Sequence, residues 1–177
     1  GVRVWKSKIR YKFNDITIFI PCPIYELLIL VGHSLLKEFR INLADFCHVI
    51  LLLPKIDSDE LMRVAKIEYM LHALSIFMLV VNHLHKMIYG DVLNFPRIEN
   101  LILRIAHSGY LKENKVSMPY NYPLSLVTMA YIGKLYEALT RGGLESLNLL
   151  LGIVKSPFTN KDGIKIFLNY LHSRLSI

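Results

Sequence analysis

YMLHALSIFMLVVNHLHKM, residues 69–87, is the stretch that decides the fold, because it is long, apolar and almost free of charge. Seventeen uncharged residues lie between Glu68 and Lys86, fewer than the roughly 20 that a membrane-spanning helix needs. The segment also contains asparagine and histidine side chains, and polar groups are costly in hydrocarbon. The pattern therefore predicts a buried helix at the centre of a helical domain, apolar on nearly all sides.

The histidines of this segment have the wrong spacing for a metal site. His83 and His85 are two residues apart, about 200° around a helix, so they point to different sides. His72 and His83 share a face, but eleven residues at about 1.5 Å each place them about 16 Å apart. The sequence therefore predicts neither a metal ion nor a cofactor.

The first twenty residues have a different period. Residues 2–13 alternate between basic and apolar side chains, which is typical of a strand. Asn14-Asp15 and the β-branched run that follows indicate a turn and a second strand. We expect residues 1–20 to form a basic β-hairpin whose apolar face anchors it to the helices. The alternating sets are Lys6, Lys8, Arg10 and Lys12 on one side, and Trp5, Ile9, Tyr11 and Phe13 on the other.

Helical patterns fill the rest of the chain. Asp57 with Glu60 three residues later resembles a helix cap, and the helix that it opens is expected to run without a break towards Gly90. The predicted fold class is mainly α, formally α+β: about six helices around a central buried helix at 61–90, with a small N-terminal hairpin. One domain, 1–177, is expected, with the hairpin at 1–20 and the helical core at 23–177. The other expected helices are 23–39, 42–53, 124–140, 144–155 and a last helix around 164–175, and the segment 95–111 is expected to be a helix or a strand.

The net charge of +7 is concentrated near the N-terminus. Five basic residues precede Asp15, the first acidic residue, whereas the remaining sixteen basic and fourteen acidic residues nearly cancel. Like charges about 7 Å apart on one strand face repel, and the phosphates of RNA or of anionic lipids would relieve this repulsion. An edge strand protected from aggregation by its lysines is the alternative explanation. The predicted anion-binding set is Arg3, Lys6, Lys8, Arg10 and Lys12.

Residues 118–123, MPYNYP, form the clearest loop. Loops often carry function and tyrosine contributes strongly to interfaces, so Tyr120 and Tyr122 are predicted to contact a protein partner. The alternative is a stiff connector with both rings folded back onto the body.

Familiar catalytic motifs are absent from the sequence, which argues against an enzyme of a familiar kind. Cys47 and His48 are adjacent in an apolar helix and diverge by about 100°, so they cannot act together as nucleophile and base. An unrecognised enzyme or small-ligand binder using His33, Cys47 and His72 stays open as a third class of function.

Residues 131–158, YIGKLYEALTRGGLESLNLLLGIVKSPF, are similar in cadence to the closing part of rhabdovirus matrix proteins, where a Tyr/Gly/Lys segment also precedes a short acidic-capped helix. The resemblance covers about thirty residues. It implies a small basic protein that assembles with itself and contacts membrane and nucleocapsid. The long histidine-bearing helix differs from the mixed α/β fold of that family, so the resemblance indicates a class and not an identity.

The sequence as a whole therefore predicts a non-enzymatic, self-associating structural or assembly protein, of the viral matrix or nucleocapsid kind. It would contact an acidic surface, RNA or an anionic membrane, and form homo-oligomers through the surplus apolar surface that a 53% hydrophobic composition implies. A helical protein–protein interaction module using the 118–123 loop is the alternative. Two cysteines, the absence of an N-glycosylation sequon and no apolar leader favour a cytoplasmic protein, with peripheral membrane or nuclear placement as variants, over a secreted one.

Overall fold

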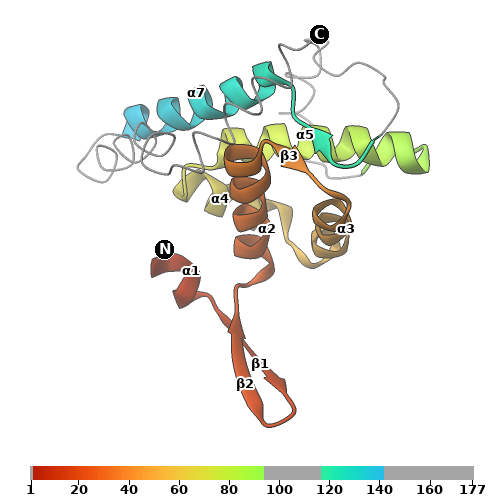
Figure 1. The fold of residues 1–177 in the computed structure, drawn as a ribbon. Coiled ribbons are helices and arrows are strands. Elements are labelled where there is room, and N and C mark those ends of the chain that lie inside the picture. Colours follow the sequence, from red (N-terminus) through yellow and green to blue (C-terminus); the bar gives the residue numbers. More distant parts are fainter. Residues whose placement is uncertain (1, 94–116, 142–177) are drawn as a thin grey trace.

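The computed structural model of the chain describes residues 2–93 and 117–141, which form a mainly helical body with a projecting β-hairpin (Figure 1). The predicted fold class is therefore confirmed. The segment 95–111, expected to be a helix or a strand, and the helices expected at 144–155 and 164–175 lie outside the described residues. The single-domain organisation stays a prediction. The described elements are α1 (Val2–Lys6), β1 (Ile9–Phe13), β2 (Ile16–Ile20), α2 (Pro23–Val31), a π-helical turn (Gly32–Glu38), β3 (Arg40–Ile41), α3 (Leu43–Leu52), a 3-10 turn (Leu53–Lys55), α4 (Ser58–Ile67), α5 (Leu71–Tyr89), β4 (Tyr120–Asn121) and α7 (Leu124–Arg141).

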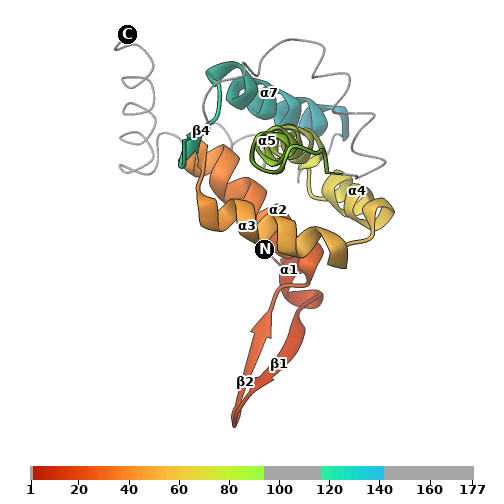
Figure 2. The same ribbon diagram turned by 90° about the vertical axis from the view of Figure 1, so that its right-hand side faces the viewer.

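Helix α5 is the centre of the body, as the sequence predicts. Figure 2 views it nearly end-on, with α7, α4 and the layer of α2 and α3 around it. Every residue from 73 to 81 is buried, so the helix is covered on all sides along its middle. Among the described residues, α5 is also the one helix that is long and apolar enough to cross a bilayer. Its position within the core gives its apolar composition a sufficient physical reason.

The uninterrupted helix expected from Asp57 to Gly90 is wrong, because α4 ends at Ile67 and α5 begins at Leu71. The Asp57 carboxylate does cap α4, accepting from the Glu60 backbone N–H at 2.8 Å. Tyr69 then adopts a left-handed conformation with φ +57°. The backbone N–H groups of Tyr69 and Met70 donate to the carbonyls of Lys66 and Ala65, at 3.3 and 2.8 Å. These two bonds make a Schellman motif, in which glycine usually occupies the position of Tyr69.

The loop expected at 118–123 is fastened to the body by a short two-stranded sheet. β3 and β4 are antiparallel, with Arg40 opposite Asn121 and Ile41 opposite Tyr120. The Tyr122 backbone N–H extends the pairing by donating to the Phe39 carbonyl at 3.0 Å. The chain therefore enters α7 from a fixed position beside the end of the π-helical turn.

The hairpin is shorter than the sequence pattern predicts. Residues 2–6 form the helical turn α1 instead of the start of a strand, and β1 begins only at Ile9. The Arg3 guanidinium on this turn lies near the end of α4, 3.5 Å from the Ile67 carbonyl and 3.7 Å from the Glu68 carboxylate. Two cations of the predicted hairpin, Arg3 and Lys6, therefore lie at its root on α1.

Candidate functional site

The N-terminal hairpin has one face that is entirely apolar. β1 and β2 pair in a register that sets Ile9 opposite Ile20, Tyr11 opposite Ile18 and Phe13 opposite Ile16. Residues directly opposite one another share a face of an antiparallel pair. The helical body does not cover this face, so the expectation that it anchors the hairpin to the helices is wrong. The six side chains, called the apolar face below, are 37% to 64% exposed: Ile9, Tyr11, Phe13, Ile16, Ile18 and Ile20.

The opposite face of the hairpin is basic. Arg10 and Lys12 are exposed and lie opposite Phe19 and Thr17. The Lys8 ammonium lies 4.1 Å above the centre of the Phe19 ring. Within the part of the chain that the structure describes, no carboxylate pairs with Lys8, Arg10 or Lys12. These three residues, called the basic face below, therefore keep their charge for solvent or for an anionic partner.

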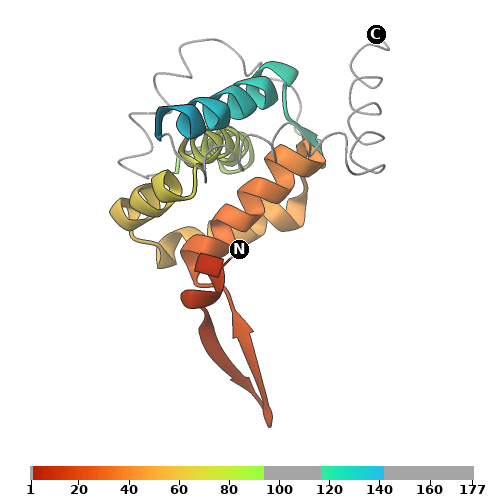
Figure 3. The same cartoon turned by 90° about the vertical axis from the view of Figure 1, so that its left-hand side faces the viewer.

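The whole hairpin extends away from the helices. Figures 1 and 3 show from two sides that β1 and β2 project from the base of α2, with α1 at their root. A projecting element can touch a large flat partner before the rest of the body does. The position of the hairpin therefore suits contact with an extended surface.

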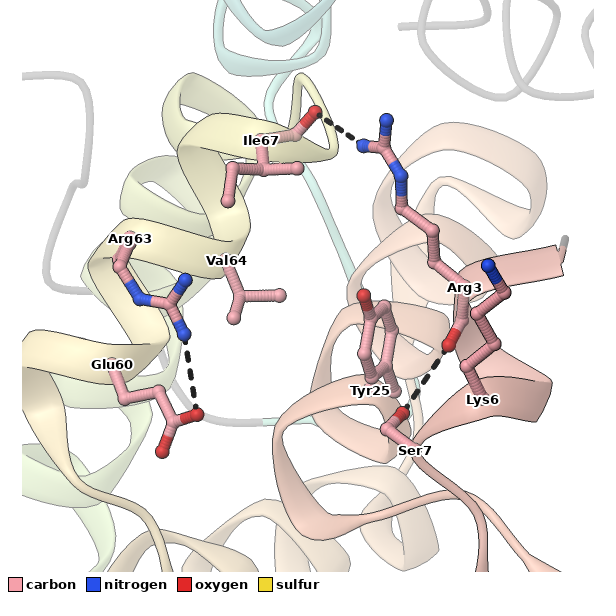
Figure 4. Close-up of a pocket in the computed structure, with 8 residues that line it drawn as sticks. All are labelled: Arg3, Lys6, Ser7, Tyr25, Glu60, Arg63, Val64 and Ile67. Carbon is pink, nitrogen blue, oxygen red and sulfur yellow. Dashed lines mark hydrogen bonds and ion pairs between the residues drawn. The ribbon is translucent and has the colours of Figure 1, made fainter.

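A cleft of about 410 Å³ lies at the root of the hairpin. Figure 4 shows that α4 forms one wall, and that α1 and the Tyr25 ring of α2 form the other. Both walls contribute cationic side chains, and the apolar surface between them comes from α4. Its lining residues are Arg3, Lys6, Ser7, Tyr25, Glu60, Arg63, Val64 and Ile67.

The tyrosines predicted to contact a partner are largely turned inward. Tyr122 is 0% exposed, and its hydroxyl lies 3.3 Å from the Ser34 hydroxyl in the core. Burial raises the pKa of the Tyr122 phenol far above its ordinary value. Tyr120 is half-buried, with its ring centre 6.5 Å from that of His83. The prediction that Tyr122 forms part of an exposed interface is therefore wrong, and Tyr120 alone gives the 118–123 loop little contact surface.

The three residues considered for an enzyme or small-ligand site do not share a contact in the described structure. His33 is half-exposed, with its imidazole 3.9 Å from the Glu38 carboxylate. Cys47 is exposed on α3. His72 lies instead against Glu137 of α7. Across residues 2–93 and 117–141, no cluster of three histidine, cysteine or acidic side chains is arranged to hold a metal ion.

The contact between α5 and α7 contains a polar cluster that sequence reasoning missed. The Glu137 carboxylate, only 8% exposed, accepts from the backbone N–H groups of His72 at 2.7 Å and Leu71 at 3.3 Å, and it also contacts the His72 ring Nδ1. Lys134 lies beside it, 3.5 Å from the Met70 sulfur, and burial lowers the pKa of its ammonium. Glu137 therefore caps the start of α5 from a different helix.

A sequence feature did point to this cluster. Glu137 falls on the same helical stripe as Leu126, Ala130 and Gly133, all of which are buried. A carboxylate on a buried stripe needs partners from a neighbouring element. The cluster has a clear structural role, whereas the hairpin and the cleft face solvent and are the candidate binding surfaces.

Most of residues 131–158, whose sequence pattern indicated a resemblance to rhabdovirus matrix proteins, lie outside the described residues. Comparison of the chain with protein-family models, with curated proteins and with solved structures finds no match.

Proposed function

We propose that this protein is a non-enzymatic peripheral protein that binds anionic membrane surfaces through its N-terminal hairpin. One observation carries the proposal: the projecting hairpin has six exposed apolar side chains on one face and, on the other, three cations that no carboxylate of the described residues pairs with. A bilayer interface with anionic lipids offers hydrocarbon to the first set and phosphate or carboxylate groups to the second.

The apolar face supplies the larger share of the expected binding energy. Complete burial of a large apolar side chain contributes about 1.5–3 kcal/mol. Only about half of the surface of each of these six side chains is still exposed. Burying that half in the membrane should contribute about 1 kcal/mol of binding free energy per side chain, or roughly 6 kcal/mol in all. Three cations near an anionic surface add about 1 kcal/mol each. High salt should therefore remove most of the contribution that the three cations make to the binding free energy, and it should leave the contribution of the apolar face.

Other partners match only half of the hairpin. RNA would neutralise Lys8, Arg10 and Lys12 but would leave the apolar face in water. A second copy of the chain would cover the apolar face but would bring no anions to the cations. An anionic membrane satisfies both faces, so it is the partner that the hairpin favours. RNA binding and self-association, which the sequence also predicts, become alternative outcomes of the same experiment.

The test is co-sedimentation of the purified chain with phosphatidylcholine vesicles that do or do not contain phosphatidylserine, across a salt series. The charge variant is Lys8→Ser/Arg10→Ser/Lys12→Ser, and its matched control removes three exposed lysines of the body, Lys37→Ser/Lys55→Ser/Lys86→Ser. The apolar variant is Phe13→Ser/Ile16→Ser, at the hairpin tip. Its matched control is Leu51→Ser/Leu139→Ser, two side chains of similar exposure on α3 and α7.

The charge variant should lose about 3 kcal/mol of binding, roughly a hundred-fold in affinity, because it removes three cations. The apolar variant removes two side chains and should lose about 2 kcal/mol, roughly thirty-fold. Each control should bind like the unchanged chain. The charge variant should also lose its salt dependence. Binding to single-stranded RNA without binding to vesicles would contradict the proposal and favour a nucleic-acid partner. Lipid-free dimers that the apolar variant abolishes, again without vesicle binding, would make the hairpin a self-association surface.

A further inference from the structure

We propose that the cleft between α1 and α4 is a binding site for a phosphomonoester group, such as the phosphorylated headgroup of a lipid. The inference rests on the proposed membrane function only for the source of this ligand. The phosphate chemistry itself is argued from the residues that line the cleft.

The cleft has the size and the side chains of a site for a small anion. Its volume of about 410 Å³ falls within the range of small-molecule sites, about 300–1,000 Å³. Arg3 and Lys6 enter from α1, and Arg63 enters from α4 across the gap (Figure 4). The Ser7 and Tyr25 hydroxyls on the α1 side already donate to a backbone carbonyl of α1 and to the Glu68 carboxylate, at 3.2 and 3.1 Å, so the cations are the donors left for a ligand. A phosphate has three oxygens that accept such donors, and arginine can bind two of them at once.

The cations of the cleft form only long, weak contacts with their present partners. The Arg3 guanidinium lies 3.5 Å from the Ile67 carbonyl oxygen and 3.7 Å from the Glu68 carboxylate. The Arg63 guanidinium lies 3.5 Å from the Glu60 carboxylate. Charge-assisted hydrogen bonds of full strength are about 2.7–2.9 Å long, so these contacts are long. Among the residues that the structure describes, nothing forms a hydrogen bond or ion pair with the Lys6 ammonium.

The charge balance of the cleft favours an anion. Three cations and one carboxylate, that of Glu60, line it, and the Glu68 carboxylate lies just beyond. Arg63 and Glu60 are 65% and 55% exposed, so their ion pair is worth at most about 1 kcal/mol in water and is easily given up. A doubly charged phosphate offers Arg63 more charge and more acceptor atoms than that carboxylate does.

The position of the cleft links it to the hairpin. Ser7 lines the cleft, and the next residue, Lys8, already belongs to the basic face of the hairpin. The proposed membrane contact includes Ile9 and Ile20, which pair at the root of the hairpin, so a bilayer that covers the whole apolar face also reaches the end of the hairpin where the cleft lies. The hairpin would supply general attraction to the bilayer, and the cleft would select the phosphorylated headgroup.

The experiment separates the cleft from the hairpin through Arg63, which lies on α4 and not on the N-terminal segment. Arg63→Gln is compared with Lys66→Gln, which removes one exposed cation from the same helix without touching the cleft. Both are titrated with phosphatidylcholine vesicles containing about 5 mol % phosphatidylinositol bisphosphate or about 20 mol % phosphatidylserine, which carry similar total charge. Soluble inositol trisphosphate and inorganic phosphate, followed by calorimetry, form the arms without lipid.

The unchanged chain and Lys66→Gln should bind the phosphatidylinositol bisphosphate vesicles more tightly than the phosphatidylserine vesicles. Arg63→Gln should reduce the affinity for the bisphosphate vesicles about five-fold and leave the affinity for the phosphatidylserine vesicles unchanged. Soluble inositol trisphosphate should compete for the cleft and so remove the preference for the bisphosphate vesicles. Equal binding of both vesicles by the unchanged chain, or equal behaviour of the two variants, would overturn the cleft inference while leaving the membrane proposal standing. Arg63-dependent binding of soluble phosphates without any vesicle binding would support the cleft and refute the membrane proposal.

Discussion

Replacing Glu137 should reveal how far one carboxylate holds α5 and α7 together. Glu137 accepts two backbone N–H groups at the start of α5, from Leu71 and His72, and contacts the His72 ring. Loss of a helix cap costs about 1 kcal/mol. Loss of a hydrogen bond to a charged group costs about 1.5–3 kcal/mol. We therefore expect Glu137→Ala to lower the free energy of unfolding by about 3 kcal/mol, and Glu137→Gln, which keeps one acceptor oxygen, to lower it by about half of that.

Urea unfolding followed by circular dichroism measures this change, with the slope of the transition used to check that the denatured state is unaffected. Glu60→Gln is the matched control, because Glu60 and its partner Arg63 are 55% and 65% exposed and should contribute about 0.5 kcal/mol or less. In a His72→Ala background the cost of Glu137→Ala should fall to about 1 kcal/mol, the part due to the backbone cap. A Glu137→Ala cost no larger than that of Glu60→Gln would refute the cap, and an unchanged cost without the His72 ring would refute the ring contact.

Three further predictions follow from the packing. Gly133→Ala would place a Cβ 2.6 Å from the His72 Cγ and should cost about 1–3 kcal/mol in thermal or urea unfolding, whereas Gly32→Ala, whose Cβ would meet only the Met70 Cε at 3.8 Å, should be neutral or stabilising. Tyr122→Phe should cost about 1 kcal/mol at neutral pH, because the buried Ser34 hydroxyl loses its partner. Burial raises the pKa of the Tyr122 phenol, so above about pH 10 only the unfolded chain ionises it, and the unchanged protein loses stability. The difference in unfolding free energy between the unchanged protein and Tyr122→Phe should therefore become smaller above about pH 10. A difference that grows with pH would contradict the burial of Tyr122. Phe13→Ser/Ile16→Ser should change the unfolding free energy by less than about 1 kcal/mol, since both side chains are mostly exposed, and a larger loss would mean that the hairpin packs on the body.

Local patterns were sufficient for much of the fold. The uncharged run between Glu68 and Lys86 correctly predicted a central buried helix, because an element that is apolar on all sides has to be covered on all sides. Asp57 followed by Glu60 correctly placed the start of α4, since capping depends on residues only three apart. Alternation over residues 2–13, with Asn14-Asp15 after them, correctly predicted a hairpin, although its first strand begins only at Ile9.

The candidate site was predictable only in part. The sequence identified the basic set Arg3, Lys6, Lys8, Arg10 and Lys12, but it predicted that the last four share one strand face. In the structure Arg3 instead contacts the end of α4, sixty-four residues away, so Arg3 and Lys6 line the cleft while the other three cations lie on the hairpin. The alternating apolar residues of the hairpin could also be recognised in the sequence. Whether the helical body covers the apolar face that they form depends on how the helices pack.

The sequence by itself determined the helical class, the central helix, the hairpin and the concentration of charge at the N-terminus. These properties depend on neighbours within about one helical turn or one strand pair, so they can be read from spacing. Only the tertiary structure decided the break at Tyr69, the burial of Tyr122, the cap that Glu137 gives to α5 and the exposure of the apolar face. The last three depend on residues far apart in the chain that meet only when the helices pack. The break at Tyr69 is closed by local hydrogen bonds, but tyrosine, unlike glycine, does not signal a left-handed position, so the sequence did not reveal it.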